Sequence, residues 1–320
     1  MRVTFPLFSM FFLASAAMAG PCTTADKTCM EKVPLGANQY FFVYRSQPLT
    51  ERSANVERVY VLVHGLHRDG DAYFKTAIAA ARDSGELDRT LVIAPQYHAV
   101  DGTCKDKPEP GETIFSCRGW SNGNSTKEAP LSSYAALDQL LRMISQRSLF
   151  PSLKEIVVAG HSAGGQFAQR YAATNRIDGT LGVPIRYVAA NPSSYLYLES
   201  WRPVANPGAS CPQFNRYKYG LEEMTGYPLE TGAAAIRSNY PHRNVTYLLG
   251  ELDKTDEHDM DKTCPAMAQG PFRLQRGLAY FDRLNKTFKT DHKLLCVPGC
   301  AHSGECMFRS ENGRRAVFGK

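Results

Sequence analysis

Hydrophobic runs and amphipathic segments alternate along most of this chain. Short runs rich in β-branched and aromatic residues predict strands, and apolar positions that recur every three or four residues predict helices packed against them. The expected strands are residues 39–45, 58–64, 90–97, 155–161, 184–190, 244–250 and 293–297. The expected helices are residues 71–84, 134–146, 166–174 and 271–287, followed by a helical stretch at the end of the chain. This alternation predicts an α/β fold, in which a mostly parallel central sheet carries helices on both faces.

Two stretches depart from this pattern. Residues 98–130 are polar and rich in Gly, Pro, Asn and Lys, which predicts a long loop. Residues 191–243 are rich in Pro, Gly, Tyr and Asn, and they are too long for a simple connection between two strands. We therefore expect residues 191–243 to form a cap-like insertion over the functional site.

The first nineteen residues have the pattern of a secretory signal peptide. Arg2 supplies a positive charge, residues 7–16 are apolar, and Ala17-Met18-Ala19 forms a site for cleavage before Gly20. The alternative is a membrane anchor, but the apolar run is short for a bilayer span, and no later segment is long and apolar enough to cross a membrane. We expect residues 20–320 to form one catalytic domain that is secreted or periplasmic, with no stable membrane insertion.

Composition and cysteine content agree with an exported globular protein. Hydrophobic residues make up 43% and charged residues 21% of the chain, and the net charge of +6 is spread without a Lys/Arg block. This distribution predicts no nucleic-acid partner. All nine cysteines follow the cleavage site, which favours disulfides in an oxidising compartment. The pairs expected are Cys22–Cys29, Cys104–Cys117 and Cys211–Cys264, and one of Cys296, Cys300 and Cys306 is left over.

The most informative motif is a Gly-x-Ser-x-Gly sequence between a strand and a helix. The expected strand 155–161 leads directly into Ser162, and the helix-compatible stretch 166–174 follows. A sharp turn at this point strains the serine backbone and exposes its hydroxyl above the sheet, while flanking glycines avoid collisions with neighbouring elements. We therefore expect Ser162 to be a nucleophile, although the five-residue motif alone is common by chance.

A serine hydroxyl needs a base to remove its proton, and the base needs an anionic group to orient it. His302 follows the last expected strand and is the candidate base. An alternative places it in a zinc site with Cys296, Cys300 and Cys306, which disulfide formation disfavours in an oxidising compartment. Asp253 follows the strand 244–250 and is the preferred acid, with Asp256 as its rival. Their acidic run could also be a solvated loop.

The order Ser162, Asp253, His302, each after an expected strand, resembles the α/β-hydrolase superfamily over essentially the whole mature chain. The resemblance is strongest to secreted, esterase-like serine hydrolases. It implies an oxyanion hole made by the backbone amides of Ala163 and Leu66. The sequence His-Gly-Leu-His at 64–67 departs from the His-Gly-Gly-Gly of many lipases and esterases, which leaves the second donor open.

The function that this resemblance implies is cleavage of carboxylic esters through an acyl-enzyme, without a cofactor or a metal. The alternatives are a serine peptidase or amidase on the same fold, and a secreted binding protein without turnover. Trp120, in the polar loop, and His161, beside the nucleophile, are the expected substrate contacts. Residues 191–243 lack the long amphipathic helix of an interfacial lipase lid, which favours a small-molecule or polymer-attached ester over dispersed fat. The aromatic residues of this insertion either line a pocket or form its core.

Overall fold

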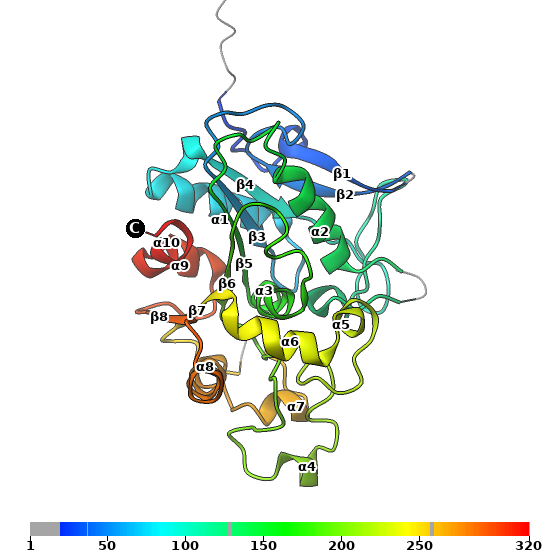
Figure 1. Cartoon of the computed structure of the whole chain (residues 1–320), viewed down its shortest axis with the longest axis vertical. Helices are drawn as coiled ribbons and strands as arrows, with labels where there is room; N and C mark the ends of the chain where they lie inside the picture. The colour runs from blue at the N-terminus through cyan, green and yellow to red at the C-terminus, as the bar shows by residue number, and fades with distance from the viewer. Residues whose placement is uncertain (1–19, 37, 127–129, 257–258, 320) are drawn as a thin grey trace, which may run out of the picture.

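The computed structural model describes residues 20–36, 38–126, 130–256 and 259–319. The expected signal peptide, residues 1–19, lies outside the described residues. The described residues form an eight-stranded sheet with the order β1-β2-β4-β3-β5-β6-β7-β8 (Figure 1). The strands are β1 (Met30–Gly36), β2 (Gln39–Arg45), β3 (Arg58–Val63), β4 (Thr90–Pro95), β5 (Glu155–His161), β6 (Ile185–Ala190), β7 (Asn244–Gly250) and β8 (Lys293–Val297). All neighbours from β4 to β8 are parallel, whereas β1–β2 and β2–β4 are antiparallel.

Helices cover both faces of this sheet, as the sequence predicts. One face packs against α1 (Gly70–Asp83), α9 (Gly304–Arg309) and α10 (Glu311–Phe318), and the other against α2 (Ser133–Ile144), α3 (Ala163–Thr174) and α8 (Arg273–Phe288) (Figure 1). The remaining short helices are α4 (Pro207–Ser210), α5 (Gly226–Thr231), α6 (Ala233–Asn239), α7 (Cys264–Met267), η1 (Lys27–Cys29), η2 (Leu87–Arg89), η3 (Trp120–Asn122) and η4 (Tyr240–His242).

The central strands are apolar on both sides because each faces two hydrophobic cores. In β3, Val59, Val61 and Val63 point into the core beneath α2 and α3. Tyr60 and Leu62 alternate with them and point into the core beneath α1 and α9. A strand buried on both faces reads as a continuous apolar run, and this is why the sequence identifies these strands so clearly.

The sequence pattern does not predict strand β1. It contains Pro34, which cannot donate a ladder hydrogen bond, and it pairs only with β2 at the edge of the sheet. Helix α3 also begins earlier than expected, at Ala163 directly after the serine. The residues after Ser162 that form the sharp turn are therefore also the first residues of the helix.

Residues 191–243 combine an irregular segment with a short helical crossover. Helix α6 and η4 pack against α3 and lead directly into β7, so this part is a crossover of the α/β fold. Helix α4 lies at the lower end of the molecule in Figure 1, and the disulfide Cys211–Cys264 ties its loop to α7. The insertion therefore has two structural parts.

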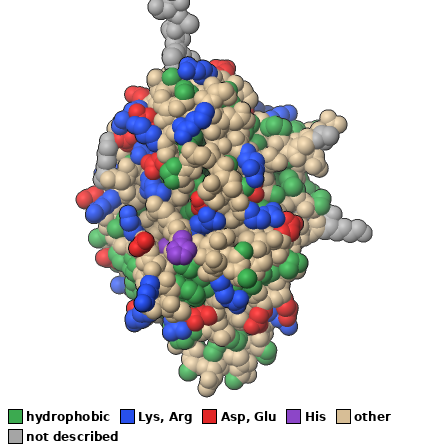
Figure 2. Space-filling view, in the orientation of Figure 1, with side chains coloured by type: hydrophobic (Ala, Val, Ile, Leu, Met, Phe, Trp, Pro, Cys, Tyr) green, Lys and Arg blue, Asp and Glu red, His purple; other side chains and the backbone are tan. Residues whose placement is uncertain are grey.

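Surface and membrane features agree with the composition. On the face shown in Figure 2, Lys and Arg side chains are interspersed with Asp and Glu. No helix within the described ranges is long and apolar enough to cross a membrane.

Candidate active site

Ser162 occupies a strained turn between β5 and α3. Its backbone has φ 58° and ψ −117°, a combination that residues other than glycine rarely adopt. The Ser162 N–H donates to the Ala190 carbonyl at 2.9 Å, which anchors the turn to the end of β6. This is the strand–turn–helix geometry that the sequence predicts around Ser162.

The three glycines around Ser162 are required by close backbone approaches. A Cβ at Gly160 would lie 2.1 Å from the Gly164 carbonyl oxygen, and one at Gly165 would lie 2.4 Å from that of Ala190. At Gly164 it would lie 2.3 Å from the carbonyl oxygen of Val63 on β3. Each gap is too small for any carbon atom, so only glycine lets α3 begin so close to the sheet.

His302 and Asp253 meet at the carboxyl ends of β7 and β8. Nδ1 of His302 lies 2.7 Å from Oδ2 of Asp253, and both side chains are buried, the Asp253 side chain to 1% exposure. A carboxylate at this distance fixes the orientation of the imidazole ring. His302 lies within the short loop closed by the disulfide Cys300–Cys306.

The structure distinguishes the two candidate acids. The backbone of Asp253 is fixed at both ends, since its N–H donates to Gly250 at 3.1 Å and its carbonyl accepts from Leu274 at 3.2 Å. Arg273, itself fully buried, donates to the second carboxylate oxygen at 3.3 Å. Asp256 instead lies on the surface and pairs with Lys262 at 2.8 Å. The structure therefore brings Asp253, and not Asp256, to His302.

Ser162 and His302 line the same cleft, which has a volume of about 240 Å³. Its other described lining residues are Gly65, Leu66, His67, Asp69, Tyr73, His161, Asp259 and Gly304. None of these described residues belongs to the segment 191–243. The part of the insertion that the structure describes therefore does not form a wall of this cleft, which corrects the expectation that it covers the site.

The backbone amides of Ala163 and Leu66 are the candidate donors of an oxyanion hole. The N–H of Ala163 is the first of α3, where helix amides have no partner inside the helix. Leu66 lines the cleft and follows β3 in the chain. Within the described residues, neither amide donates a hydrogen bond to the protein. Both amides therefore remain candidates for the oxyanion hole that the sequence resemblance implies.

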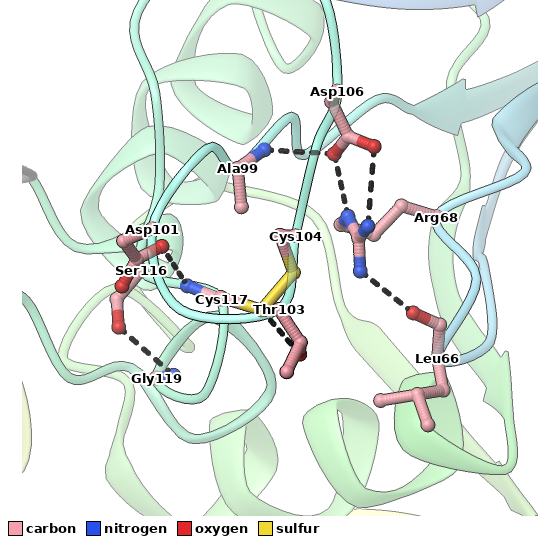
Figure 3. Close-up of a disulfide and its surroundings, with 10 residues drawn as sticks. All are labelled: Leu66, Arg68, Ala99, Asp101, Thr103, Cys104, Asp106, Ser116, Cys117 and Gly119. Carbon is pink, nitrogen blue, oxygen red and sulfur yellow. Dashed lines mark hydrogen bonds and ion pairs between the residues drawn. A yellow bond between two sulfur atoms is a disulfide. The ribbon is translucent and has the colours of Figure 1, made fainter.

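Arg68 and Asp106 brace the loop that contains Leu66, and no sequence pattern predicts this contact. Arg68 donates to the Leu66 carbonyl at 2.9 Å and grips the Asp106 carboxylate with two further bonds (Figure 3). Asp106 also accepts from the amide of Ala99 at 2.8 Å, beside the disulfide Cys104–Cys117 (Figure 3). Arg68 has φ 57°, a conformation that cannot be read from its residue type.

The two expected substrate contacts lie in different places. His161 lines the cleft: its ring is 4.5 Å from that of His302, and Tyr73 forms a hydrogen bond with its Nδ1 at 3.0 Å. Burial, with the neighbouring His302, holds the pKa of His161 well below its usual range. Trp120 is in the core instead, 1% exposed, with its ring 4.6 Å from that of His64. The expectation that Trp120 lines the cleft is therefore corrected.

The cysteine pairs agree with the sequence predictions. Cys22–Cys29, Cys104–Cys117 and Cys211–Cys264 are bonded, and Cys300–Cys306 forms a fourth pair. Cys296 is the thiol left over. Because Cys300 and Cys306 are bonded to each other and His302 to Asp253, the alternative zinc set is not assembled.

The fold and the strained serine turn agree with a comparison to known families. The model of the alpha/beta hydrolase family matches residues 60–316. The chain belongs to this family. A search of curated proteins found no match.

Solved structures share the fold of this α/β hydrolase at low sequence identity. Poly(aspartic acid) hydrolase-1 from Sphingomonas sp. KT-1 is 21% identical with a TM-score of 0.64, over 90% of this chain and 97% of that one. LpqC, a poly(3-hydroxybutyrate) depolymerase from Bordetella parapertussis, is 22% identical with a TM-score of 0.62, over 93% and 94%. An S-formylglutathione hydrolase from Agrobacterium tumefaciens is 15% identical with a TM-score of 0.51, over 90% and 93%.

Proposed function

We propose that this α/β hydrolase cleaves carboxylic esters through an acyl-enzyme on Ser162. His302 is the general base and Asp253 orients it. The observation that carries the proposal is the 2.7 Å contact between His302 and Asp253 at the cleft that Ser162 lines. A buried carboxylate on one imidazole nitrogen leaves the other nitrogen to exchange a proton with the serine.

The reaction follows from these positions. His302 takes the proton of the Ser162 hydroxyl while its oxygen attacks the ester carbonyl, and a tetrahedral oxyanion forms. The C–O bond to the alcohol then breaks, and the alcohol leaves with the proton from His302. Water, deprotonated by His302, attacks the acyl-enzyme, releases the acid and restores the Ser162 hydroxyl.

The amides of Ala163 and Leu66 would hold the oxyanion of both tetrahedral intermediates. Donors fixed in advance stabilise charge without reorganisation, and loss of one typically costs on the order of 100-fold in turnover. The bracing of Leu66 by Arg68 supports this role, because it fixes the peptide that carries one donor.

The cleft favours a soluble or polymer-attached ester. It is lined mainly by polar side chains. A second cavity of about 540 Å³, between α1 and α9, shares Asp69, Tyr73 and Gly304 with the lining of the cleft. One structure with the same fold is named as a depolymerase of a polyester, poly(3-hydroxybutyrate), which supports this substrate class. Another is named as a hydrolase of poly(aspartic acid), a polyamide, which supports the amidase alternative instead.

We further propose that the protein acts outside the cytoplasm. Four disulfides would persist only in an oxidising compartment, and they support secretion or a periplasmic location.

A substrate panel on the purified mature protein tests this function. It compares p-nitrophenyl esters of increasing acyl length with aminoacyl and prolyl p-nitroanilides, using Ser162→Ala as the blank. Ester turnover that is present in the wild type and absent in Ser162→Ala supports the proposal. Turnover of anilides in preference to esters would make the protein a peptidase or amidase, and turnover of neither would contradict an enzymatic role.

A further inference from the structure

Asp69 stands at the position where a side chain normally caps helix α1. Aspartate is a favoured N-cap because its carboxylate accepts hydrogen bonds from the first amides of the helix. Here the carboxylate makes no such bond, although the Asp69 carbonyl accepts from Ala72 and Tyr73 as in an ordinary first turn. The side chain instead lines the cleft that contains Ser162.

The described residues provide no hydrogen-bond donor and no ion-pair partner for the Asp69 carboxylate. Its Oδ1 is buried and forms no hydrogen bond. A buried carboxylate oxygen without a donor is destabilising, because it has lost its hydrogen bonds to water and gained none in the protein. A ligand that supplies a positive charge would remove this cost.

The other acidic groups that line the cleft and the adjoining cavity each have a basic side chain beside them. Oδ2 of Asp259 lies 3.3 Å from Nε2 of His67, which carries a positive charge only when it is protonated. In the adjoining cavity, Lys75 pairs with Asp71 at 3.6 Å and Glu305 with Arg309 at 2.7 Å. Among the described lining residues, Asp69 is thus the carboxylate with no basic side chain in contact, and it lines both cavities.

The histidine beside Ser162 does not offset this charge. His161 is 3% exposed, its Nδ1 is bonded to Tyr73, and its Nε2 is buried without a partner. An imidazole in this setting stays neutral at ordinary pH, because its cation would be buried next to His302. The cleft therefore carries an unbalanced negative charge close to the nucleophile.

We propose that Asp69 is a specificity residue that selects esters carrying a positively charged group, such as an ammonium, near the reacting carbonyl. The inference rests on the proposed ester hydrolysis at Ser162. The positive charge of the substrate would lie in the cleft or in the cavity between α1 and α9. It could belong to either the alcohol or the acyl side of the ester. Electrostatic attraction of this kind acts on substrate capture, so it raises kcat/KM more than kcat.

Two pairs of substrates with matched shapes test the inference. Acetylcholine and 3,3-dimethylbutyl acetate differ by a charge on the alcohol side, and glycine betaine ethyl ester and ethyl 3,3-dimethylbutanoate differ by one on the acyl side. The ratio of kcat/KM within each pair is measured for the wild type and for Asp69→Asn. Comparing these ratios between proteins cancels the intrinsic reactivity of each ester.

Asp69→Asn removes the charge without removing a favoured N-cap residue, so the helix should form normally. Asp71→Asn is the matched control: it removes the same charge from the first turn of α1, where Asp71 pairs with Lys75 and does not line the cleft. We expect Asp69→Asn to lower the cationic-to-neutral ratio on the order of tenfold in at least one pair, and added salt to shrink the wild-type ratio. Asp71→Asn should leave both ratios unchanged.

The outcomes separate the inference from the function on which it rests. Ester turnover with ratios that Asp69→Asn does not change in either pair would overturn the role of Asp69 and leave the hydrolase proposal intact. An equal change in Asp71→Asn would also overturn it, because the effect would then come from net charge alone. Absence of turnover on every ester would contradict the proposed function itself.

Discussion

The guanidinium of Arg68 binds the carboxylate of Asp106 at 2.5 Å and 3.1 Å, and its remaining nitrogen donates to the carbonyl of Leu66. This pair joins the loop after β3 to the disulfide-bonded segment 98–126. Because the peptide of Leu66 carries one candidate oxyanion donor, we expect its orientation to depend on the pair.

Asp106→Asn tests this dependence. The variant keeps the size of the side chain but loses the charge-assisted bonds, so the donor at Leu66 becomes less well aligned. We expect kcat for ester hydrolysis to fall by about tenfold with little change in KM. Glu230→Gln, which breaks the exposed pair with Arg176, should leave kcat unchanged. An unaltered kcat in a folded Asp106→Asn protein would argue against the brace.

Asp253 and Asp256 offer a direct comparison between two acids of one loop. Asparagine at 253 would leave His302 without its anionic partner and would favour the wrong tautomer, so we expect kcat to fall by roughly 10³–10⁴. Asp256→Asn breaks only the surface pair with Lys262 and should change kcat less than about twofold. Because the ion pair between Arg273 and Asp253 is also lost in Asp253→Asn, circular dichroism must show that this variant is folded. A larger loss in Asp256→Asn would reverse the assignment.

The disulfide Cys300–Cys306 encloses His302 in a short loop. Replacing both cysteines by serine should let this loop move, and we expect kcat to fall by about tenfold because His302 is less well positioned. The matched control is Cys22→Ser with Cys29→Ser, which opens a loop of similar length away from the cleft. Kinetics and thermal unfolding are measured for both. Equal losses of kcat in the two double variants would mean that the effect is general rather than local.

His64 makes folding stability depend on pH. Its Nδ1–H donates to Gly65 and its Nε2 accepts from the amide of Tyr97, so the ring is held neutral. Burial lowers the pKa of His64 to about 3. The unfolded chain therefore binds a proton that the folded chain does not, and stability falls as the pH drops from about 6.5 towards 3, by up to roughly 1.4 kcal/mol per pH unit.

Urea unfolding at pH 7.5 and pH 5 measures this effect. We expect the difference in unfolding free energy between the two pH values to be smaller in His64→Gln than in the wild type. His242→Gln changes an exposed histidine and should keep the wild-type difference. If His64→Gln kept it as well, the buried ring would not be the cause.

Much of the fold could be predicted because its central strands are buried on both faces. Seven strands and the glycine-flanked turn at Ser162 follow from local sequence, since the apolar runs and the glycines reflect nearby packing. Strand β1 could not be predicted, because an edge strand with Pro34 is stabilised only by pairing with β2. The candidate acid and base could be predicted because each follows a predicted strand.

The residues that surround the site depend on contacts between distant segments. Trp120 lies in a polar loop, yet this loop folds back so that the indole packs against His64 and Phe167. Arg68 and Asp106 are ordinary charged residues in the sequence, and only the fold brings them together. For Trp120, only the general tendency of large aromatic residues to be buried could have predicted its place in the core.

Labelling with a fluorophosphonate probe tests the central claim, that Ser162 is a nucleophile activated by His302 and Asp253. The probe forms a covalent bond with activated serines, and intact-protein mass spectrometry with peptide mapping identifies the modified residue. We predict one adduct, on Ser162, in the wild type, much slower labelling in Asp253→Asn and none in Ser162→Ala. An unlabelled wild type that is correctly folded, or an adduct of equal yield in Ser162→Ala, would contradict the account.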